Sequence, residues 1–466
     1  MWNFEKYSKK VACITEFGQW TYGQIDSLAE EFAQYVPKRS LILILCRNTP
    51  GSLFSYLCSM KTDCVPLLLP ANMDMDAFKE MMCTYHPNYL CVPKDMAEVF
   101  SMEKRFELED YVVLHAFEEK VEMYKNLGLL LSTSGSTGSP KLVRQSKENV
   151  EANARQIAEY LELKDDERPI TTMPMNYTYG LSIINSHLLV GAVLLLTNRT
   201  LFETEFWEFF KKEKATSFGA VPYTYKMLKR LRFTKMDLPD LRYFTQAGGK
   251  LSLELHQEYA EYAKSSGKKF IVMYGQTEAT ARMSYLPWEK SLEKIGSIGI
   301  AIPEGRFSLR DVNNQEISEP NMVGELIYEG PNVTLGYAQK QGDLILGDER
   351  MGVLITGDMA KKDEDGYYYI VGRKKRFIKV FGNRMNLDEM ELAINKNCNV
   401  ESAICGEDDF VEVYVVKGGE ILPVEKYLQE RFHLHPSAYA VKEVDEIPKN
   451  DSGKILYSKL MEGREK

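Results

Sequence analysis

A run of small polar residues follows a short apolar stretch near residue 130, and its composition suits the binding of phosphate. Leu129–Leu131 predicts the end of a buried strand, and Thr133–Lys141 then supplies hydroxyls, two glycines and one cation. Glycines let backbone N–H groups turn toward an anion, hydroxyls donate hydrogen bonds, and Lys141 adds a charged donor. A Walker A loop needs glycine before its lysine and Ser or Thr after it, but Pro140 and Leu142 stand there. The stretch predicts a phosphate loop of another type, with an ordinary polar surface loop as the alternative.

Further motifs make the phosphate-loop interpretation specific. Thr133–Lys141 resembles the phosphate loop of the AMP-forming adenylating superfamily, which includes acyl-CoA synthetases, adenylation domains of peptide synthetases and luciferases. One such motif is a weak signal, but five in the order of the superfamily, clearest from residue 130 onward, are a strong one. The four later motifs are Tyr274–Glu278, Thr356–Asp358, Gly372-Arg373 leading to Ile378-Lys379, and Pro448–Lys454.

The segments that would position these motifs alternate between helix and strand. Apolar periodicity predicts helices at 21–35, 52–60, 74–85 and 148–161, and each of the first three is followed by a strand, at 40–46, 64–69 and 89–92. This alternation predicts an α/β fold with mainly parallel, helix-flanked sheets, in which ligands bind at the carboxyl ends of strands. The resemblance implies a large N-terminal domain, residues 1–374, and a small, mobile α+β C-terminal domain, residues 375–466.

The resemblance assigns most of the nucleotide contacts. The phosphate loop would hold the β- and γ-phosphates, Tyr274 would lie along the adenine, and Asp358 would accept hydrogen bonds from both ribose hydroxyls with Arg373 assisting. A double glycine after residue 247 would flank the adenine and the acyl pocket. The implied nucleotide-binding residues are Thr133, Ser134, Ser136, Thr137, Lys141, Gly248, Gly249, Tyr274, Gly275, Asp358 and Arg373.

Three residues are implied to be catalytic. Thr277 would contact the α-phosphate, and Glu278 would hold Mg²⁺, for which one carboxylate with phosphate oxygens and water suffices. Lys454 would bridge the substrate carboxylate and the α-phosphate. Loss of such a preorganised donor is expected to slow adenylation roughly 10²- to 10³-fold and thioester formation less.

The second half-reaction is also assigned by resemblance. The small domain would rotate about the hinge residue Lys375, so that Lys454 withdraws and Gly382 lines a tunnel for the thiol of CoA or of phosphopantetheine. We therefore predict that Lys375→Pro, which restricts the backbone, impairs the thiol step more than formation of acyl-AMP.

The predicted substrate pocket contains aromatic and small polar residues. Many acyl-CoA synthetases have histidine at the position of Tyr177, and amino-acid-activating members have aspartate at that of Thr178, so an α-amino acid is disfavoured. The composition favours a short, hydroxylated or aromatic acid, and no charged residue stands out as a partner for a second carboxylate or an amine. Tyr177 could alternatively be a core aromatic. The pocket residues are Tyr177, Thr178, Val221, Thr245 and Gly249.

Composition excludes several classes of function. A net charge of -9 argues against nonspecific nucleic-acid binding, and no apolar run is long enough for an integral membrane segment. The N-terminal residues contain no apolar signal region, and the eight cysteines include no CxxC pair, which indicates a reduced cytoplasmic protein.

The resemblance and these observations predict an AMP-forming acid–thiol ligase. It would use ATP and Mg²⁺ to convert a small carboxylic acid into acyl-AMP and then transfer the acyl group, most simply to CoA. One alternative is an enzyme that loads a separate phosphopantetheine carrier protein, and another is a nucleotide-binding paralogue that has lost catalysis. No Gly-x-Ser-x-Gly motif suggests a hydrolase, and nothing indicates the oxygen chemistry of luciferases.

Overall fold

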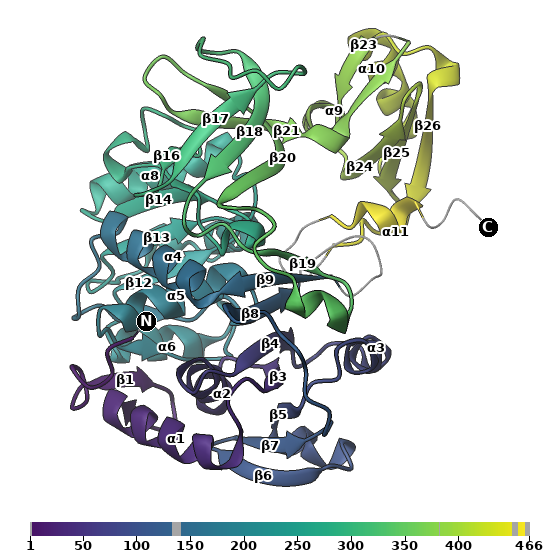
Figure 1. The fold of residues 1–466 in the computed structure, drawn as a ribbon. Coiled ribbons are helices and arrows are strands. Elements are labelled where there is room, and N and C mark those ends of the chain that lie inside the picture. The colour runs from purple at the N-terminus through teal and green to yellow at the C-terminus, as the bar shows by residue number, and fades with distance from the viewer. Residues whose placement is uncertain (1, 133–140, 382, 450–454, 462–466) are drawn as a thin grey trace. The chain divides into compact units, whose positions relative to one another are not determined.

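The computed structural model describes residues 2–132, 141–381, 383–449 and 455–461 (Figure 1). Contacts divide these residues into two compact units. The first contains the described residues up to 307 together with 328–354, and the second contains 308–327 and the described residues from 355 onward. The predicted boundary after residue 374 concerns a hinge, which one conformation does not test, so it stays a prediction.

Two large sheets form the first unit. The central strands β8, β4, β3 and β5 of the eight-stranded sheet are parallel, and its outer pairs are antiparallel. Every residue of β3 is buried, as expected for a central parallel strand covered on both faces. The strand order is β19 (Gly336–Ala338), β9 (Leu142–Ser146), β8 (Leu127–Ser132), β4 (Val65–Pro70), β3 (Leu41–Cys46), β5 (Tyr89–Pro93), β7 (Tyr111–His115) and β6 (Glu103–Leu108).

The nine-stranded sheet also has a parallel centre and antiparallel edges. Together the two sheets and their helices confirm the predicted α/β class. The order is β16 (Ile300–Ala301), β15 (Ser284–Tyr285), β14 (Lys269–Tyr274), β13 (Tyr243–Gln246), β12 (Ser217–Ala220), β10 (Pro169–Ile170), β11 (Leu194–Leu195), β1 (Val11–Ile14) and β2 (Gln19–Thr21).

Helices cover both faces of these sheets. Capping boxes begin two of them: Thr21 and Gln24 cap α1, and Ser146 and Asn149 cap α4. No helix in the described ranges is long and apolar enough to cross a bilayer. The helices of the first unit are α1 (Tyr22–Tyr35), α2 (Pro50–Lys61), α3 (Met75–Tyr85), α4 (Lys147–Tyr160), α5 (Thr178–Leu189), α6 (Thr204–Lys212), α7 (Pro222–Arg230) and α8 (Leu253–Ser265).

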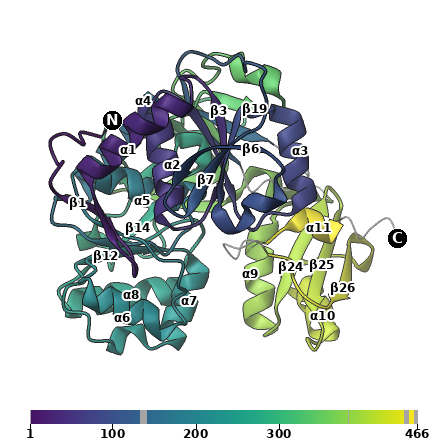
Figure 2. The same cartoon turned by 90° about the horizontal axis from the view of Figure 1, so that it is seen from below.

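The two faces of the nine-stranded sheet carry different helices. Figure 2 shows α6, α7 and α8 on one side of β12 and β14, with α4 and α5 on the other. Side chains alternate along β13 accordingly: Phe244 packs against Tyr259 of α8, whereas Tyr243 belongs to the cluster that includes Tyr179 of α5. Ala247, in the loop after β13, belongs to the same cluster, so this loop packs on the α4–α5 face of the sheet.

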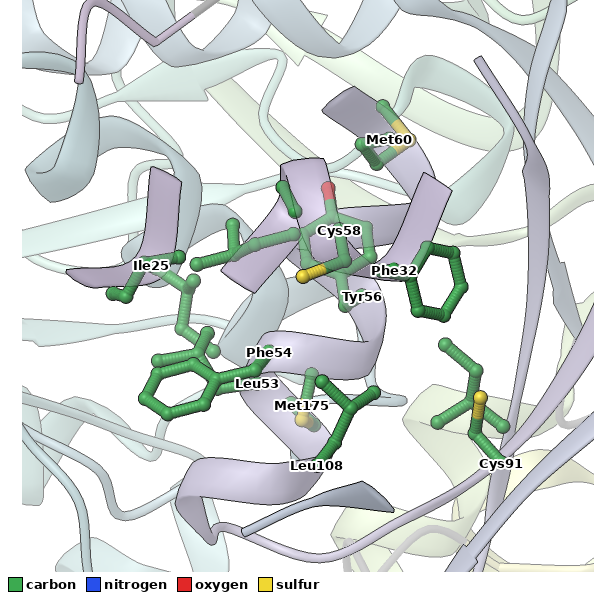
Figure 3. Packing of buried hydrophobic residues seen from close by; sticks show 14 of the residues in the cluster. Ile25, Phe32, Leu53, Phe54, Tyr56, Cys58, Met60, Cys91, Leu108 and Met175 are labelled. Atoms are coloured by element: carbon green, nitrogen blue, oxygen red, sulfur yellow. The ribbon is translucent and has the colours of Figure 1, made fainter. Parts of the chain in front are cut away.

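Helix α2 anchors α5 within the core. Figure 3 shows side chains of α2 packed against side chains of α1, β5 and β6. Every residue of α2 from Gly51 to Met60 is buried. The Ser52 hydroxyl donates to Met175 Sδ (3.0 Å), just before α5, and the Tyr56 hydroxyl donates to Asn185 Oδ1 within it (3.0 Å). These two hydrogen bonds from α2 fix the position of α5.

The second unit is built from smaller sheets. Its C-terminal part contains the hairpin β22–β23, the three-stranded sheet of β24, β25 and β26, and three helices, which fits the α+β class that the resemblance implies. The strands are β17 (Arg306–Arg310), β18 (Val323–Glu329), β20 (Val353–Lys362) and β21 (Tyr368–Arg373) in one sheet, β22 (Phe377–Val380) with β23 (Asn383–Asn386), and β24 (Ser402–Glu407), β25 (Phe410–Val416) and β26 (Tyr439–Val444); the helices are α9 (Leu387–Asn397), α10 (Ile421–Phe432) and α11 (Tyr457–Met461).

Candidate active site

The loop after β14 is tightly constrained. A Cβ on Gly275 would lie 1.7 Å from the carbonyl oxygen of Ala281, so this position requires glycine. A short 3-10 helix, Thr277–Ala279, follows, and Thr280 adopts a positive φ of 64° as the chain turns back. The fold thus presents Thr277 and Glu278 just after the carboxyl end of β14, which pairs in parallel with β13.

Glu278 is held from both its backbone and its side chain. Its carbonyl oxygen accepts hydrogen bonds from the amide (3.0 Å) and hydroxyl (2.9 Å) of Thr334 and from the Arg350 guanidinium (3.0 Å). Its Oε1 accepts one from the Tyr337 hydroxyl at 2.8 Å. The described residues offer Oε2 no hydrogen-bond donor. A half-buried carboxylate with one oxygen fixed and the other available fits Mg²⁺, which needs few protein ligands.

Tyr337 links Glu278 to the phosphate loop. Lys141 Nζ lies 3.4 Å from the centre of the Tyr337 ring, and the Arg350 guanidinium lies 4.5 Å from it. Burial, followed by the nearby Glu278 carboxylate, raises the pKa of Tyr337 to about 12, so the phenol is a neutral donor at pH 7. The rest of the predicted loop, including Thr133, Ser134, Ser136 and Thr137, lies outside the described residues.

The double glycine approaches the predicted acyl pocket closely. Gly248 has a φ of +84°, and a Cβ there would lie 2.6 Å from the Tyr177 hydroxyl and 3.0 Å from Val221 Cγ1. The neighbouring Gly249 lies near Pro222. The structure therefore brings Tyr177, Val221 and the two glycines together.

The other two predicted pocket residues make internal contacts. The buried Thr178 donates its hydroxyl to the carbonyl oxygen of Thr280. The Thr245 carbonyl accepts the hydroxyls of Tyr179 (2.9 Å) and Tyr225 (2.8 Å), and its Oγ1 lies 2.8 Å from the Tyr179 hydroxyl. Both threonines support the pocket wall in this structure.

Tyr274, the residue predicted beside the adenine, ends β14. Its ring centre lies 6.4 Å from that of Phe307 at 51°, and its hydroxyl accepts a hydrogen bond from Gln276 Nε2 at 3.2 Å. These contacts hold an aromatic side chain beside the constrained loop. Its proposed role against the base remains a prediction.

Sequence analysis did not single out Arg282, which lies four residues after Glu278. It is 2% exposed, and its side-chain contacts with described residues are to neutral groups. Nε donates to Ser182 Oγ at 3.1 Å, and the guanidinium carbon lies 4.3 Å from the centre of the Tyr179 ring. A buried cation behind the pocket aromatics was detectable in sequence only as a lone arginine in a run of small and apolar residues.

The second unit carries a buried carboxylate of its own. Asp358, whose side chain is 3% exposed, pairs with Arg373 across β20 and β21, with Oδ1 2.9 Å from Nε. Arg373 donates its amide to Asp388 Oδ2 at 3.2 Å. Lys375 lies in the 3-10 turn Lys374–Arg376 that follows. The predicted residues Gly382 and Lys454 lie outside the described ranges.

The α/β core thus places a carboxylate and a lysine against one tyrosine at strand ends. The sequence model of the AMP-binding enzyme family matches residues 2–338. The chain therefore belongs to the family of AMP-binding enzymes, and the resemblance to the adenylating superfamily is confirmed.

Known proteins similar to this chain include ligases and solved structures. The long-chain-fatty-acid–CoA ligase of Bacillus subtilis is 26% identical over 85% of this chain and 75% of that protein. The oxalate–CoA ligase of Arabidopsis thaliana is 28% identical over 70% of this chain, which spans 65% of that protein. The structure of o-succinylbenzoate CoA synthetase from Bacillus subtilis with ATP and magnesium has a TM-score of 0.79 at 21% identity and covers 98% of both chains. This last likeness shows that the fold is shared.

Proposed function

We propose that this protein activates a carboxylic acid as acyl-AMP, with release of pyrophosphate, and transfers the acyl group to the thiol of CoA. A carboxylate is a poor acyl donor because its oxygen leaves poorly. Attack of a carboxylate oxygen on the α-phosphorus of ATP breaks the bond to pyrophosphate and turns that oxygen into part of a good leaving group, AMP. The thiol then forms the thioester, and AMP departs.

The observation that carries this proposal is the Glu278–Tyr337–Lys141 arrangement. Phosphoryl chemistry of this type rests on positioning and charge rather than on a protein nucleophile. A carboxylate with one free oxygen and a lysine lie against the same tyrosine ring. Bound Mg²⁺ would neutralise charge on the phosphate oxygens; Glu278 would hold it, and Lys141 would face the departing phosphates.

The remaining roles follow the predicted assignments. Thr277 would bind the α-phosphate, and Asp358 with Arg373 would bind the ribose. Lys454 would bridge the two reacting groups during adenylation, and Lys375 with Gly382 would serve the thiol step. The free state of all eight cysteines supports the proposed reducing, cytoplasmic setting.

The similar ligases act on acids of different kinds, so the acid is proposed from the pocket. Tyr177, Val221 and the double glycine form a wall of aromatic and small groups rather than a long aliphatic channel. This composition supports a short, hydroxylated or aromatic acid. CoA is proposed as acceptor because the named relatives are CoA ligases.

The decisive experiment measures pyrophosphate release from ATP and Mg²⁺ with a panel of short aliphatic, hydroxy, aryl and amino acids, each with and without CoA. Continuous release with one acid class only when CoA is present is the expected result. Acid-dependent pyrophosphate exchange that CoA does not change would indicate a carrier-protein acceptor. Binding of ATP with no release for any acid would refute the proposal and favour a paralogue without catalysis.

Two variants make this experiment specific to the site. Glu278→Gln removes the charge that holds the metal and is expected to reduce release at least 10²-fold, as loss of a transition-state electrostatic group does. Glu208→Gln, on the exposed side of α6, is the matched control and is expected to behave as the native protein. Equal activity of the two variants would remove Glu278 from the mechanism.

A further inference from the structure

Arg282 is a buried cation without an anionic partner. In the part of the chain that the structure describes, no carboxylate lies within ion-pair distance of its guanidinium. Its contacts are Ser182 Oγ, the Tyr160 hydroxyl at a long 3.4 Å, the sulfur of Met273 and the ring face of Tyr179. The second terminal nitrogen, NH2, makes no hydrogen bond to a described residue. Arginine stays charged in proteins, so this charge is not removed by deprotonation.

The position of this guanidinium is fixed by its backbone. Asn153 of α4 holds the main chain of Arg282, with Oδ1 accepting from the Arg282 amide (3.3 Å) and Nδ2 donating to the Arg282 carbonyl (3.0 Å). Asn332 Nδ2 donates to the same carbonyl at 2.9 Å. Three buried polar contacts therefore aim one side chain between α4 and α5, which is the preorganisation expected of a binding group.

The guanidinium lines a small cavity whose walls are mainly apolar and which shares Thr245 with the predicted acyl pocket. The cavity, about 10 Å³, has room for roughly one water molecule and is also lined by Thr245, Tyr243, His187 and Ser217. His187 is no counter-ion: its Nδ1 donates to the Ile183 carbonyl, its Nε2 accepts from Tyr243, and burial lowers its pKa to about 4.

Aromatic rings connect this cavity to the pocket wall. The Arg282 guanidinium stacks on Tyr179, and the Tyr179 ring centre lies 6.4 Å from that of Tyr177, the residue that approaches Gly248. Thr245 belongs to both the cavity and the predicted pocket. Tyr179 and Thr245 thus connect the predicted pocket wall at Tyr177 to the guanidinium.

We propose that Arg282 is the counter-ion for a second carboxylate on the acid substrate, so that the enzyme activates one end of a short dicarboxylic acid and holds the other. This inference rests on the proposed ligase function and narrows its substrate class. An unpaired charge in a protein interior is costly, and a carboxylate beside the guanidinium offsets that cost only in the bound state. The cavity holds about one water molecule, so the surrounding side chains must move apart to admit a carboxylate, and larger anions are disfavoured.

The test compares matched acids that differ in one charge. Straight-chain dicarboxylates from succinate to adipate are assayed for pyrophosphate release against their half-amides, which keep the length and the carbonyl oxygen. The native enzyme is expected to prefer one dicarboxylate over its half-amide. In Arg282→Gln the ratio of kcat/KM values for that pair is expected to fall about 100-fold, as when one partner of a buried charge pair is truncated. Arg282→Lys should restore part of the ratio.

Controls separate the charge from the fold and from the ligase activity. Arg155→Gln removes an exposed arginine of α4 and is expected to leave the ratio unchanged. A native enzyme without preference between diacid and half-amide, or an unchanged ratio in Arg282→Gln, would overturn the proposal. The comparison of diacid and half-amide with the native enzyme requires no variant. It therefore tests the inference even if Arg282→Gln folds poorly.

A binding measurement distinguishes failure of this inference from failure of the proposed function. Calorimetric titration of the preferred diacid into the native protein and Arg282→Lys or Arg282→Gln needs no turnover. Charge-dependent binding of the diacid without pyrophosphate release would keep the carboxylate site and refute the ligase function. Pyrophosphate release with monocarboxylates together with no charge-dependent diacid binding would keep the ligase function and refute the site.

Discussion

Two arginines of the first unit are almost fully buried, yet their surroundings are opposite. Arg144, on β9, donates to the carbonyl oxygens of Tyr337 (2.9 Å), Leu346 and Gly347 (3.2 Å) and pairs with the Glu349 carboxylate. Among the described residues, the Arg282 guanidinium contacts neutral hydroxyls, a sulfur and a ring, and no carboxylate. The same residue type at the same burial is thus charge-compensated by the protein in one place and not in the other.

The contacts of Arg144 show that its role is structural. Its carbonyl partners belong to β19 and the chain that follows, so Arg144 fastens that segment to the sheet. Gly336, the first residue of β19, has a φ of +136°, a conformation that favours glycine. Arg282 has no comparable structural task that needs a charge. The difference indicates that a buried cation is structural when the protein supplies its anion and is directed at a ligand when the protein does not.

The largest expected effect is on stability. Arg144→Met leaves Glu349 and several carbonyls without their donor and should lower the free energy of unfolding by about 3–5 kcal/mol. Arg282→Met removes a charge that no anion compensates, and we expect a change below about 1 kcal/mol. Urea unfolding followed by tryptophan fluorescence measures both, because all four tryptophans lie in the first unit.

Arg155→Met, at an exposed position, is the reference for a loss of arginine without burial and should change the free energy of unfolding by less than about 0.5 kcal/mol. Equal destabilisation by Arg144→Met and Arg282→Met would contradict the contrast between the two arginines, because it would show that both have a structural role.

The second effect tests the region fastened by Arg144. Tyr337→Phe removes the hydroxyl that orients Glu278, a hydrogen bond to a charged group worth about 1.5–3 kcal/mol, so ATP binding with Mg²⁺ should weaken about tenfold. Binding of ATP in the presence of EDTA should change little. Titration calorimetry under both conditions measures this, with the exposed Tyr35→Phe as control. Equal weakening with and without Mg²⁺ would assign Tyr337 to the fold rather than to the metal site.

Sequence periodicity predicted much of the α/β frame because buried strands and amphipathic helices leave local signals. The predicted strand at 40–46 appears as β3, and the predicted helix at 148–161 appears as α4 within a residue at each end. The hairpin of β6 and β7 was not predicted, because its charged residues mask the alternation.

Sequence analysis predicted those site residues that lie within short motifs, but not contacts between segments that are far apart in the chain. Thr277 and Glu278 follow their strand directly, whereas Tyr337 reaches Glu278 only because β19 pairs with β9, far away in the chain. The environment of Arg282 is created by α4, α5 and β14 together. Whether a buried arginine pairs with an anion depends on that packing and cannot be predicted from the neighbouring sequence.

The smallest effect concerns the field of Arg282 at His187. Burial, chiefly, with a smaller contribution from the Arg282 charge, lowers the pKa of His187 from 6.5 to about 4, while burial alone does so for His256. Because the folded-state pKa lies below the unfolded one, this histidine contributes stability above pH 6.5 that is lost as pH falls toward 4. Arg282→Met should raise the pKa of His187 and reduce that acid-dependent loss.

NMR titration of the imidazole resonances measures this shift directly, and His256, whose lowered pKa owes nothing to Arg282, is the internal reference. An upward movement confined to His187 would show that the Arg282 charge acts unneutralised in the interior. An unchanged pKa of His187 would mean that other groups already screen the guanidinium, and the contrast with Arg144 would then disappear. The same titration with the preferred dicarboxylate bound should move His187 in the same direction in the native protein, because the carboxylate neutralises the charge that Arg282→Met deletes.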